Sequence, residues 1–207
     1  MDSEFWEYQT AHAFDDHVRP INDFVDTINA ESGLRAPYVA PYYGGVSARV
    51  LSVLRDPGRG AHGETGSGFL CIENADPTSA RQRTLFADVG ITPADMIPWI
   101  AYPFFIDRAP KALELTAGAA ILRRLLHLPG LDIRVILLQG NEARDVWRRL
   151  RKVDPATAAR FDPGAIQTIH PSPNALRTNK PDERARREAD RATAYAEAAR
   201  LLRPVAR

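Results

Sequence analysis

The sequence predicts an α/β protein in which helices cover both faces of a central, mainly parallel sheet of four strands, a three-layer α/β/α arrangement. Short aliphatic runs recur along the chain, and each is followed by a longer stretch whose apolar side chains have helical spacing. Strands that alternate with helices usually pair in parallel and are buried on both faces. The chain has 207 residues, 44% of them hydrophobic, with no internal repeat or long linker. We therefore expect residues 1–207 to form a single domain.

Each expected strand is a short run of aliphatic residues that ends at a turn. The run VLSVL stops at Asp56-Pro57-Gly58, where proline lacks a donor for the strand ladder and glycine permits a tight turn. The run RVILLQ is the clearest strand, and Gly140-Asn141 follows it. The expected strands cover 50–54, 96–102, 134–139 and 165–169.

The helices are expected where apolar residues recur every three or four positions. Pro20 breaks or kinks the first helix, and Asp76 or Thr78 is expected to cap the second, which ends at Gly90. Segment 36–45 is too rich in proline, glycine and aromatic residues for a regular element. The expected helices cover 3–32, 80–89, 116–128, 142–153 and 182–202.

Composition narrows the class of protein. Cys71 is the single cysteine, so we expect no disulfide, no zinc site and no iron–sulfur cluster, and no metal or cofactor. No apolar run approaches the roughly 20 residues that span a membrane, and the acidic N-terminus does not resemble a signal peptide. A cytoplasmic protein is the expectation. Residues 177–207 hold nine Lys and Arg against five Asp and Glu. This excess of positive charge would favour contacts with phosphate groups, although a solvent-exposed helix face with mixed charges is the more common explanation of such a pattern.

Three groups are expected at the carboxyl ends of strands, where open α/β sheets form their ligand crevices. They are Asp56, the segment 99–103, and His170. A carboxylate there can position water or stabilise a cation, and an imidazole can hydrogen-bond a developing anion. The glycine-rich loop 58–68 lets backbone approach a ligand closely. Two plainer interpretations stay open: Asp56 caps a turn, and His170 is an ordinary loop histidine.

The motif HPSP at 170–173, together with the DP turn at 56–57, resembles the two signature loops of the uracil-DNA glycosylase superfamily. The blocks 66–69, 74–78 and 99–103 are similar to a cluster-free bacterial branch of that superfamily. The resemblance covers about residues 36–180 and depends on the order and spacing of four blocks.

This resemblance implies a DNA repair enzyme that hydrolyses the N-glycosidic bond of uracil, or of another deaminated base, and leaves an abasic site. Its partner would be single- or double-stranded DNA, and we expect a monomer. Asp56 would position water and stabilise the sugar cation, His170 would stabilise the departing base, and Phe69 would stack on that base. Leu176 would be an apolar wedge and Arg177 a phosphate contact. The implied DNA-binding residues are Ser67, Ser172, Asn174, Leu176 and Arg177.

Two positions of the expected base pocket depart from the family pattern. Ile100 stands where the family usually has an asparagine that reads the uracil edge. Either the register differs, or Asn74, Asn141 or backbone reads the base, or uracil is not the preferred base. Gly58 replaces a pocket tyrosine or phenylalanine, which implies a roomier pocket and a wider range of bases. The expected base pocket comprises Gly58, Phe69, Asn74 and Ile100.

Two other functions compete with the glycosylase hypothesis. The substitution at Ile100 is also compatible with a non-catalytic member that binds damaged DNA. A glycine-rich loop beside a crevice also suits a nucleoside or nucleotide hydrolase.

Overall fold

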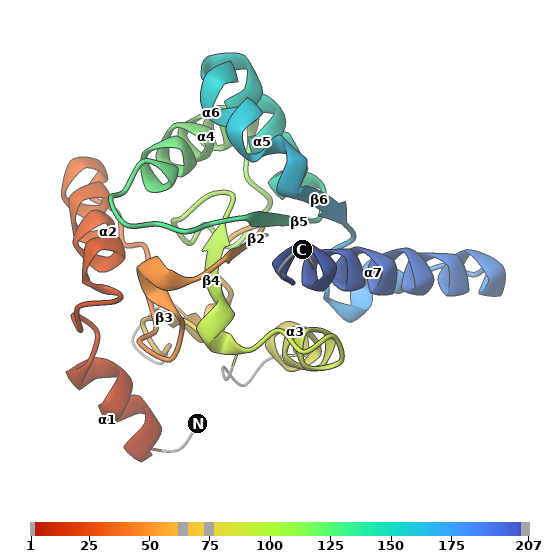
Figure 1. Cartoon of the computed structure of the whole chain (residues 1–207), viewed down its shortest axis with the longest axis horizontal. Helices are drawn as coiled ribbons and strands as arrows, with labels where there is room; N and C mark the ends of the chain where they lie inside the picture. The colour runs from red at the N-terminus through yellow and green to blue at the C-terminus, as the bar shows by residue number, and fades with distance from the viewer. Residues whose placement is uncertain (1–2, 62–65, 73–76, 204–207) are drawn as a thin grey trace.

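The computed structural model describes residues 3–61, 66–72 and 77–203 (Figure 1). The helices are α1 (Ser3–Ala11), α2 (Arg19–Ser32), α3 (Pro77–Ala87), α4 (Ala112–Leu126), α5 (Asn141–Val153), α6 (Pro155–Phe161) and α7 (Pro181–Leu202). The strands are β1 (Tyr38–Val39), β2 (Val50–Leu54), β3 (Phe69–Leu70), β4 (Met96–Ile100), β5 (Val135–Gln139) and β6 (Ala165–Thr168). No helix in these described ranges is both long and apolar enough to cross a membrane.

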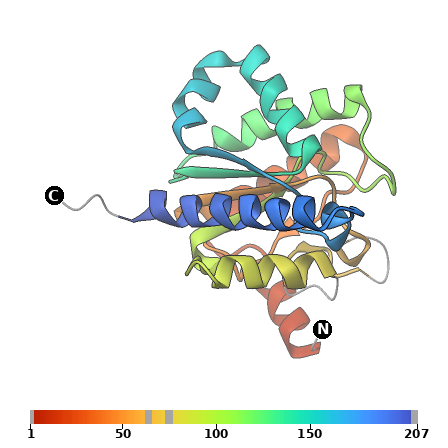
Figure 2. The same cartoon turned by 90° about the vertical axis from the view of Figure 1, so that its right-hand side faces the viewer.

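The central sheet has four strands in the order β4-β2-β5-β6, and every pair is parallel. Helices α4, α5 and α6 lie on one side of this sheet, and α3 and α7 lie on the other (Figures 1 and 2). The predicted three-layer fold is therefore confirmed. Because the strands are parallel, the loops that follow β2, β4, β5 and β6 all leave from one edge of the sheet.

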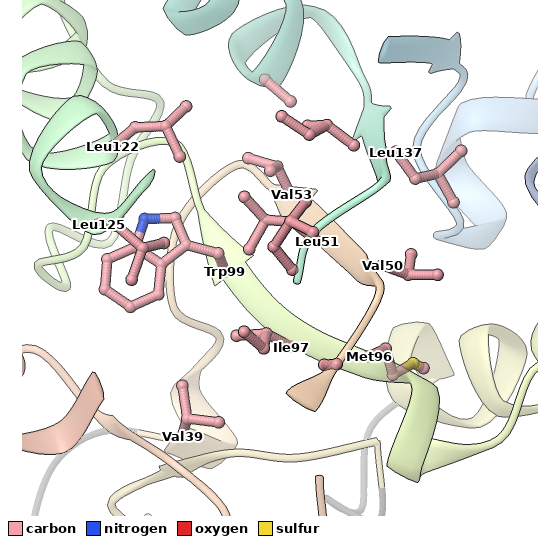
Figure 3. Packing of buried hydrophobic residues seen from close by; sticks show 14 of the residues in the cluster. Val39, Val50, Leu51, Val53, Met96, Ile97, Trp99, Leu122, Leu125 and Leu137 are labelled. Atoms are coloured by element: carbon pink, nitrogen blue, oxygen red, sulfur yellow. The ribbon is translucent and has the colours of Figure 1, made fainter. Parts of the chain in front are cut away.

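The apolar core explains why the strand sequences are continuous aliphatic runs. All five residues of β5 are buried, as are the first four of β2, because helices cover both faces of the sheet. Figure 3 shows Trp99 of β4 beside Leu122 and Leu125 of α4. These side chains join the helical layer to the sheet.

A buried polar network attaches α3 and α7 to the other face of the sheet. Ser52 Oγ of β2 accepts hydrogen bonds from Gln139 Nε2 at 2.7 Å and from Gln82 Nε2 of α3 at 2.9 Å. Tyr195 of α7 donates its hydroxyl to Gln139 Oε1 at 2.5 Å. These paired groups specify where both helices sit, because a buried polar atom without a partner is unfavourable.

The N-terminal segment corrects the prediction of one helix over 3–32. The chain forms two helices there, separated at 12–18. Pro20 lies in the first turn of α2, where its missing N–H breaks no helical hydrogen bond. Asn22 donates its side-chain amide to the Ala13 carbonyl at 2.6 Å, which satisfies a group left open by the break.

Three elements were not predicted. Strands β1 and β3 pair in parallel but are two residues long, too short for a periodic pattern. Helix α6 is also short, although its start carries a sequence signal. Asp154 caps it by accepting a hydrogen bond from the Thr157 N–H at 3.0 Å, and Pro155 follows the cap.

Candidate active site

A cleft of about 810 Å³ opens at the carboxyl edge of the sheet. Asp56 follows β2 and His170 follows β6, and both line this cleft although they are far apart in the sequence. Strand β5 lies between β2 and β6 in the sheet, and the residues after it complete the wall. Six of the predicted site residues line the cleft: Asp56, Gly58, Ile100, His170, Ser172 and Asn174.

Asp56 is the buried acid of the cleft. Its side chain is 7% exposed and accepts a hydrogen bond from Arg55 Nε. Burial raises the pKa of the Asp56 carboxyl above its ordinary value near 3.8, and the negative charges of Glu142 and Asp107 raise it further. Arg55 acts in the opposite direction and lowers this pKa, but burial has the larger effect. The arrangement keeps a poorly hydrated carboxyl group at the cleft wall.

His170 is half-buried, and its ring orientation is set by the backbone of its own loop. The Ser172 N–H donates to His170 Nδ1 at 3.1 Å. An N–H can only donate, so Nδ1 accepts and the ring proton of the neutral imidazole belongs on Nε2. This tautomer leaves an N–H donor on the ring atom that Ser172 does not use.

Gly140 connects the end of β5 to the position of His170. Its backbone has φ +100° and ψ 178°, a conformation that residues other than glycine rarely adopt. Its N–H donates to the Thr168 carbonyl at 2.9 Å, at the end of the strand that carries His170. A methyl group on Gly140 would lie 3.4 Å from His170 Cβ and 3.9 Å from Glu142 Oε2. His170 and the Glu142 carboxylate therefore both lie within 4 Å of the position that a Gly140 methyl group would occupy.

The apolar part of the cleft includes Ile100 and Gly58. Ile100 is 3% exposed, ends β4 and belongs to a small apolar cluster with Ala61 and Leu70. A side chain at Gly58 would meet no atom of the described residues within 4 Å, so glycine leaves open space on that side. Among the described residues that line this cleft, Gln82, Asn141 and Asn174 carry side-chain amides, the type of group that Ile100 lacks.

Charged groups of both signs surround the acid and the imidazole. Arg59 and Asp107 form a two-pronged ion pair, with Nη2 2.8 Å from Oδ2 and Nε 3.2 Å from Oδ1, that joins two loops at the cleft. Arg144 also lines the cleft, and its Nε is buried without a hydrogen-bond partner among the described residues. Arg144 thus brings a positive charge to the cleft wall, with one donor that has no acceptor among the described residues.

The loop that carries His170 is braced by α7. Arg187 Nη1 donates to the Ala175 carbonyl at 3.1 Å and to the Arg177 carbonyl at 3.4 Å. Its Nη2 bonds to Glu183 Oε1 at 2.6 Å, which holds the guanidinium in place. Arg187 therefore positions the loop backbone between Ser172 and Arg177.

Four other predicted site residues, all within the described part of the chain, do not line the cleft. Phe69 is 5% exposed in β3, with its ring 6.2 Å from that of Tyr38, so stacking on a base would require it to leave this position. The Ser67 hydroxyl bonds locally to the backbone N–H and carbonyl of Phe69, both at 3.1 Å. Leu176 is 8% exposed, and a wedge role would require it to emerge from its loop. Arg177 lines a second cavity. Asn74 lies outside the described residues.

Several residues that line the cleft were not predicted from the sequence. Glu142 follows a strand end, so the rule that selected Asp56 and His170 would also have selected it. Arg144 lies one helical turn beyond Gly140 on α5. Gln82 and Arg187 lie on the inner faces of α3 and α7, and no sequence pattern distinguishes them from neighbouring polar residues.

No group of three or more His, Cys, Asp or Glu side chains able to hold a metal ion occurs within the described ranges. The chain matches no protein-family model, and no curated protein matches it by sequence.

Proposed function

We propose that this protein is a DNA glycosylase that hydrolyses the N-glycosidic bond of uracil, or of another deaminated base, in DNA. The observation that carries the proposal is the placement of Asp56 and His170 on one cleft of about 810 Å³. A cleft of this size suits a flipped nucleotide, because an enzyme that acts on a base must take it out of the helical stack.

The two residues have separate roles in the proposed reaction. The bond between C1′ of the sugar and the base nitrogen breaks, and its electron pair leaves with the base. His170 donates a hydrogen bond from Nε2 to the oxygen on which this negative charge develops. Asp56, ionised, stabilises the positive charge at C1′ and orients the water whose oxygen bonds to C1′. The proton released by the water balances the charge of the departing base.

The neutral state of His170 supports this division of roles. The Ser172 N–H occupies Nδ1 as a donor, and a doubly protonated ring would have no lone pair to accept it. A neutral imidazole can donate one hydrogen bond to an anion without itself changing protonation state. The open space at Gly58 supports a wider range of bases than uracil alone. The proposal includes DNA as the partner, a monomeric enzyme and a cytoplasmic location.

The decisive experiment offers the protein single- and double-stranded oligonucleotides that carry uracil, hypoxanthine or xanthine, followed by alkali to cleave abasic sites. We expect strand breaks only at the lesion. Asp56→Asn should lower the cleavage rate by about two to four orders of magnitude, and His170→Ala by roughly 100- to 1000-fold. Asp132→Asn and His127→Ala, matched changes at residues that do not line the cleft, should retain wild-type rates.

Ile100 favours one alternative, a protein that binds damaged DNA without cleaving it. An isoleucine at the end of β4 makes no hydrogen bond to a base edge. Intact strands together with lesion-dependent binding would select this alternative. Turnover of free nucleosides or nucleotides with no dependence on DNA would select a small-molecule hydrolase. Either result would refute the glycosylase proposal.

A further inference from the structure

A second cavity lies behind the loop that carries His170. It has a volume of about 1090 Å³ and lies between α3, the loop 171–179 and α7. Pro171, Pro173, Leu176 and Arg177 line this cavity, whereas Ser172, Asn174 and Ala175 line the cleft. One short loop therefore separates the two hollows.

Positive charge dominates the wall of the second cavity. Four arginines line it, from α3, the loop and α7: Arg81, Arg177, Arg184 and Arg191. Glu188 is the single acidic residue among the described residues of this wall, and its Oε1 lies 3.7 Å from Arg184 Nε. Neither Arg81 nor Arg177 forms a side-chain ion pair within the described part of the chain.

Arg191 is the feature that points to a ligand. The residue is 1% exposed, yet its Nε and Nη1 are buried without a hydrogen-bond partner among the described residues. Burial and the neighbouring positive charge of Arg81 both lower the pKa of the Arg191 guanidinium. A buried guanidinium with two donors that lack an acceptor is unfavourable unless an anion pairs with it.

The donors of this wall match one ligand chemistry. A guanidinium presents several N–H groups in a planar fork that fits the oxygens of a phosphoryl group. Three further arginines on the same wall can share its negative charge. A carboxylate would occupy fewer donors, and an uncharged ligand would leave the charge of Arg191 unpaired.

We propose that this cavity, formed by Arg81, Arg177, Arg184 and Arg191, is a phosphoryl-binding site distinct from the cleft. Its occupant is either a free phosphate-bearing molecule or a phosphodiester of DNA. Occupancy pairs the buried guanidinium and stabilises the face of the His170 loop opposite to the cleft. The site does not require that the cleft cleave a glycosidic bond.

The test uses inorganic phosphate as the first probe, at constant ionic strength maintained with sodium chloride, and records the thermal midpoint and the heat of binding. We expect phosphate to raise the midpoint of the wild-type chain. The double variant Arg81→Gln/Arg184→Gln, at two exposed positions, should bind phosphate at least about tenfold more weakly. Arg186→Gln, on the same helix but not lining the cavity, should behave as wild type.

Arg191→Met tests the buried charge itself with a side chain of similar length. We expect it to raise the midpoint in phosphate-free buffer, because it removes an unpaired buried charge, and to abolish the phosphate-induced shift. If Arg191→Met does not fold, the double variant still decides the question, since its two positions lie outside the core.

The second arm measures binding of undamaged duplex DNA to the same variants as salt is raised. A DNA phosphodiester is the occupant if phosphate does not shift the thermal midpoint and the double variant binds duplex DNA more weakly, with a shallower salt dependence, whereas Arg186→Gln does not. A phosphate shift lost in the double variant identifies a free phosphate-bearing ligand. Equal behaviour of the double variant and Arg186→Gln in both arms would overturn the proposal, whatever the outcome of the cleavage assay.

Discussion

Replacing Gly140 by alanine tests whether the junction between β5 and α5 holds His170 in its position. At φ +100° and ψ 178° the residue occupies a region that is essentially restricted to glycine. The added methyl group itself would make ordinary contacts, 3.4 Å from His170 Cβ and 3.6 Å from His170 Cδ2. The unfavourable contribution therefore comes from the backbone rather than from a clash.

The expected loss of stability and of rate follows from this backbone conformation. A residue forced into this region costs about 1–3 kcal/mol, which the folded state either bears or relieves by shifting the backbone. A shift would move the Gly140 N–H away from the Thr168 carbonyl, 2.9 Å distant, and would disturb the start of the loop that carries His170. Displacement of a catalytic group by about 1 Å can lower a rate on the order of 100-fold.

Two measurements on one variant separate these effects. Urea denaturation gives the free energy of unfolding, and single-turnover cleavage of a uracil-containing oligonucleotide gives the rate. Gly33→Ala is the matched control, because Gly33 also has positive φ (+68°) but caps the end of α2 and does not line the cleft. We expect both variants to lose stability and Gly140→Ala alone to lose activity. Wild-type stability and rate in Gly140→Ala would refute the reasoning about this junction.

Four further predictions concern the cleft and the loop that carries His170. Asp56→Asn should raise the free energy of unfolding at pH 7, because the raised pKa of Asp56 means that its ionised carboxyl group destabilises the folded state. The stability gained by the variant should shrink as the pH falls through the pKa of Asp56 in the folded state toward its ordinary value near 3.8. A pH-independent difference in urea denaturation would contradict it. Glu142→Gln removes a charge that raises the Asp56 pKa, so the acidic limb of the cleavage profile should move to lower pH, and an unmoved limb would show that Asp56 does not control it. Arg187→Met should make the loop backbone more mobile and slow cleavage, with little change in the free energy of unfolding. Hydrogen exchange of the backbone amides at 175–177 should become faster, and unchanged exchange would show that Arg187 does not brace the loop. Leu176→Ala should slow cleavage of duplex substrate more than of single-stranded substrate, because single strands need no wedge, and equal slowing would remove that role.

The sequence was sufficient to predict the layered fold, because the signals that specify it are local. The aliphatic runs at 50–54 and 134–139, each followed by a turn and a helical pattern, predict buried parallel strands and helices on both faces. The same rule predicted that Asp56 and His170 follow strand ends and so share one edge of the sheet. Short elements without a periodic pattern, such as β1 and β3, could not be predicted in this way.

Only the tertiary structure determined which residues near the predicted site line the cleft. Phe69 and Leu176 carry apolar side chains in the expected region, yet Phe69 is buried in β3 as part of the main apolar core, and Leu176 is buried in the loop after β6. Gln82, Arg144 and Arg187 enter the cleft wall because helices α3, α5 and α7 pack against the sheet at specific rotations. Such rotations depend on side-chain packing between elements far apart in sequence. Arg191 is buried with two donors that lack a partner among the described residues, and this too is a product of packing, since nothing in the pattern of α7 separates it from the exposed arginines on the same helix.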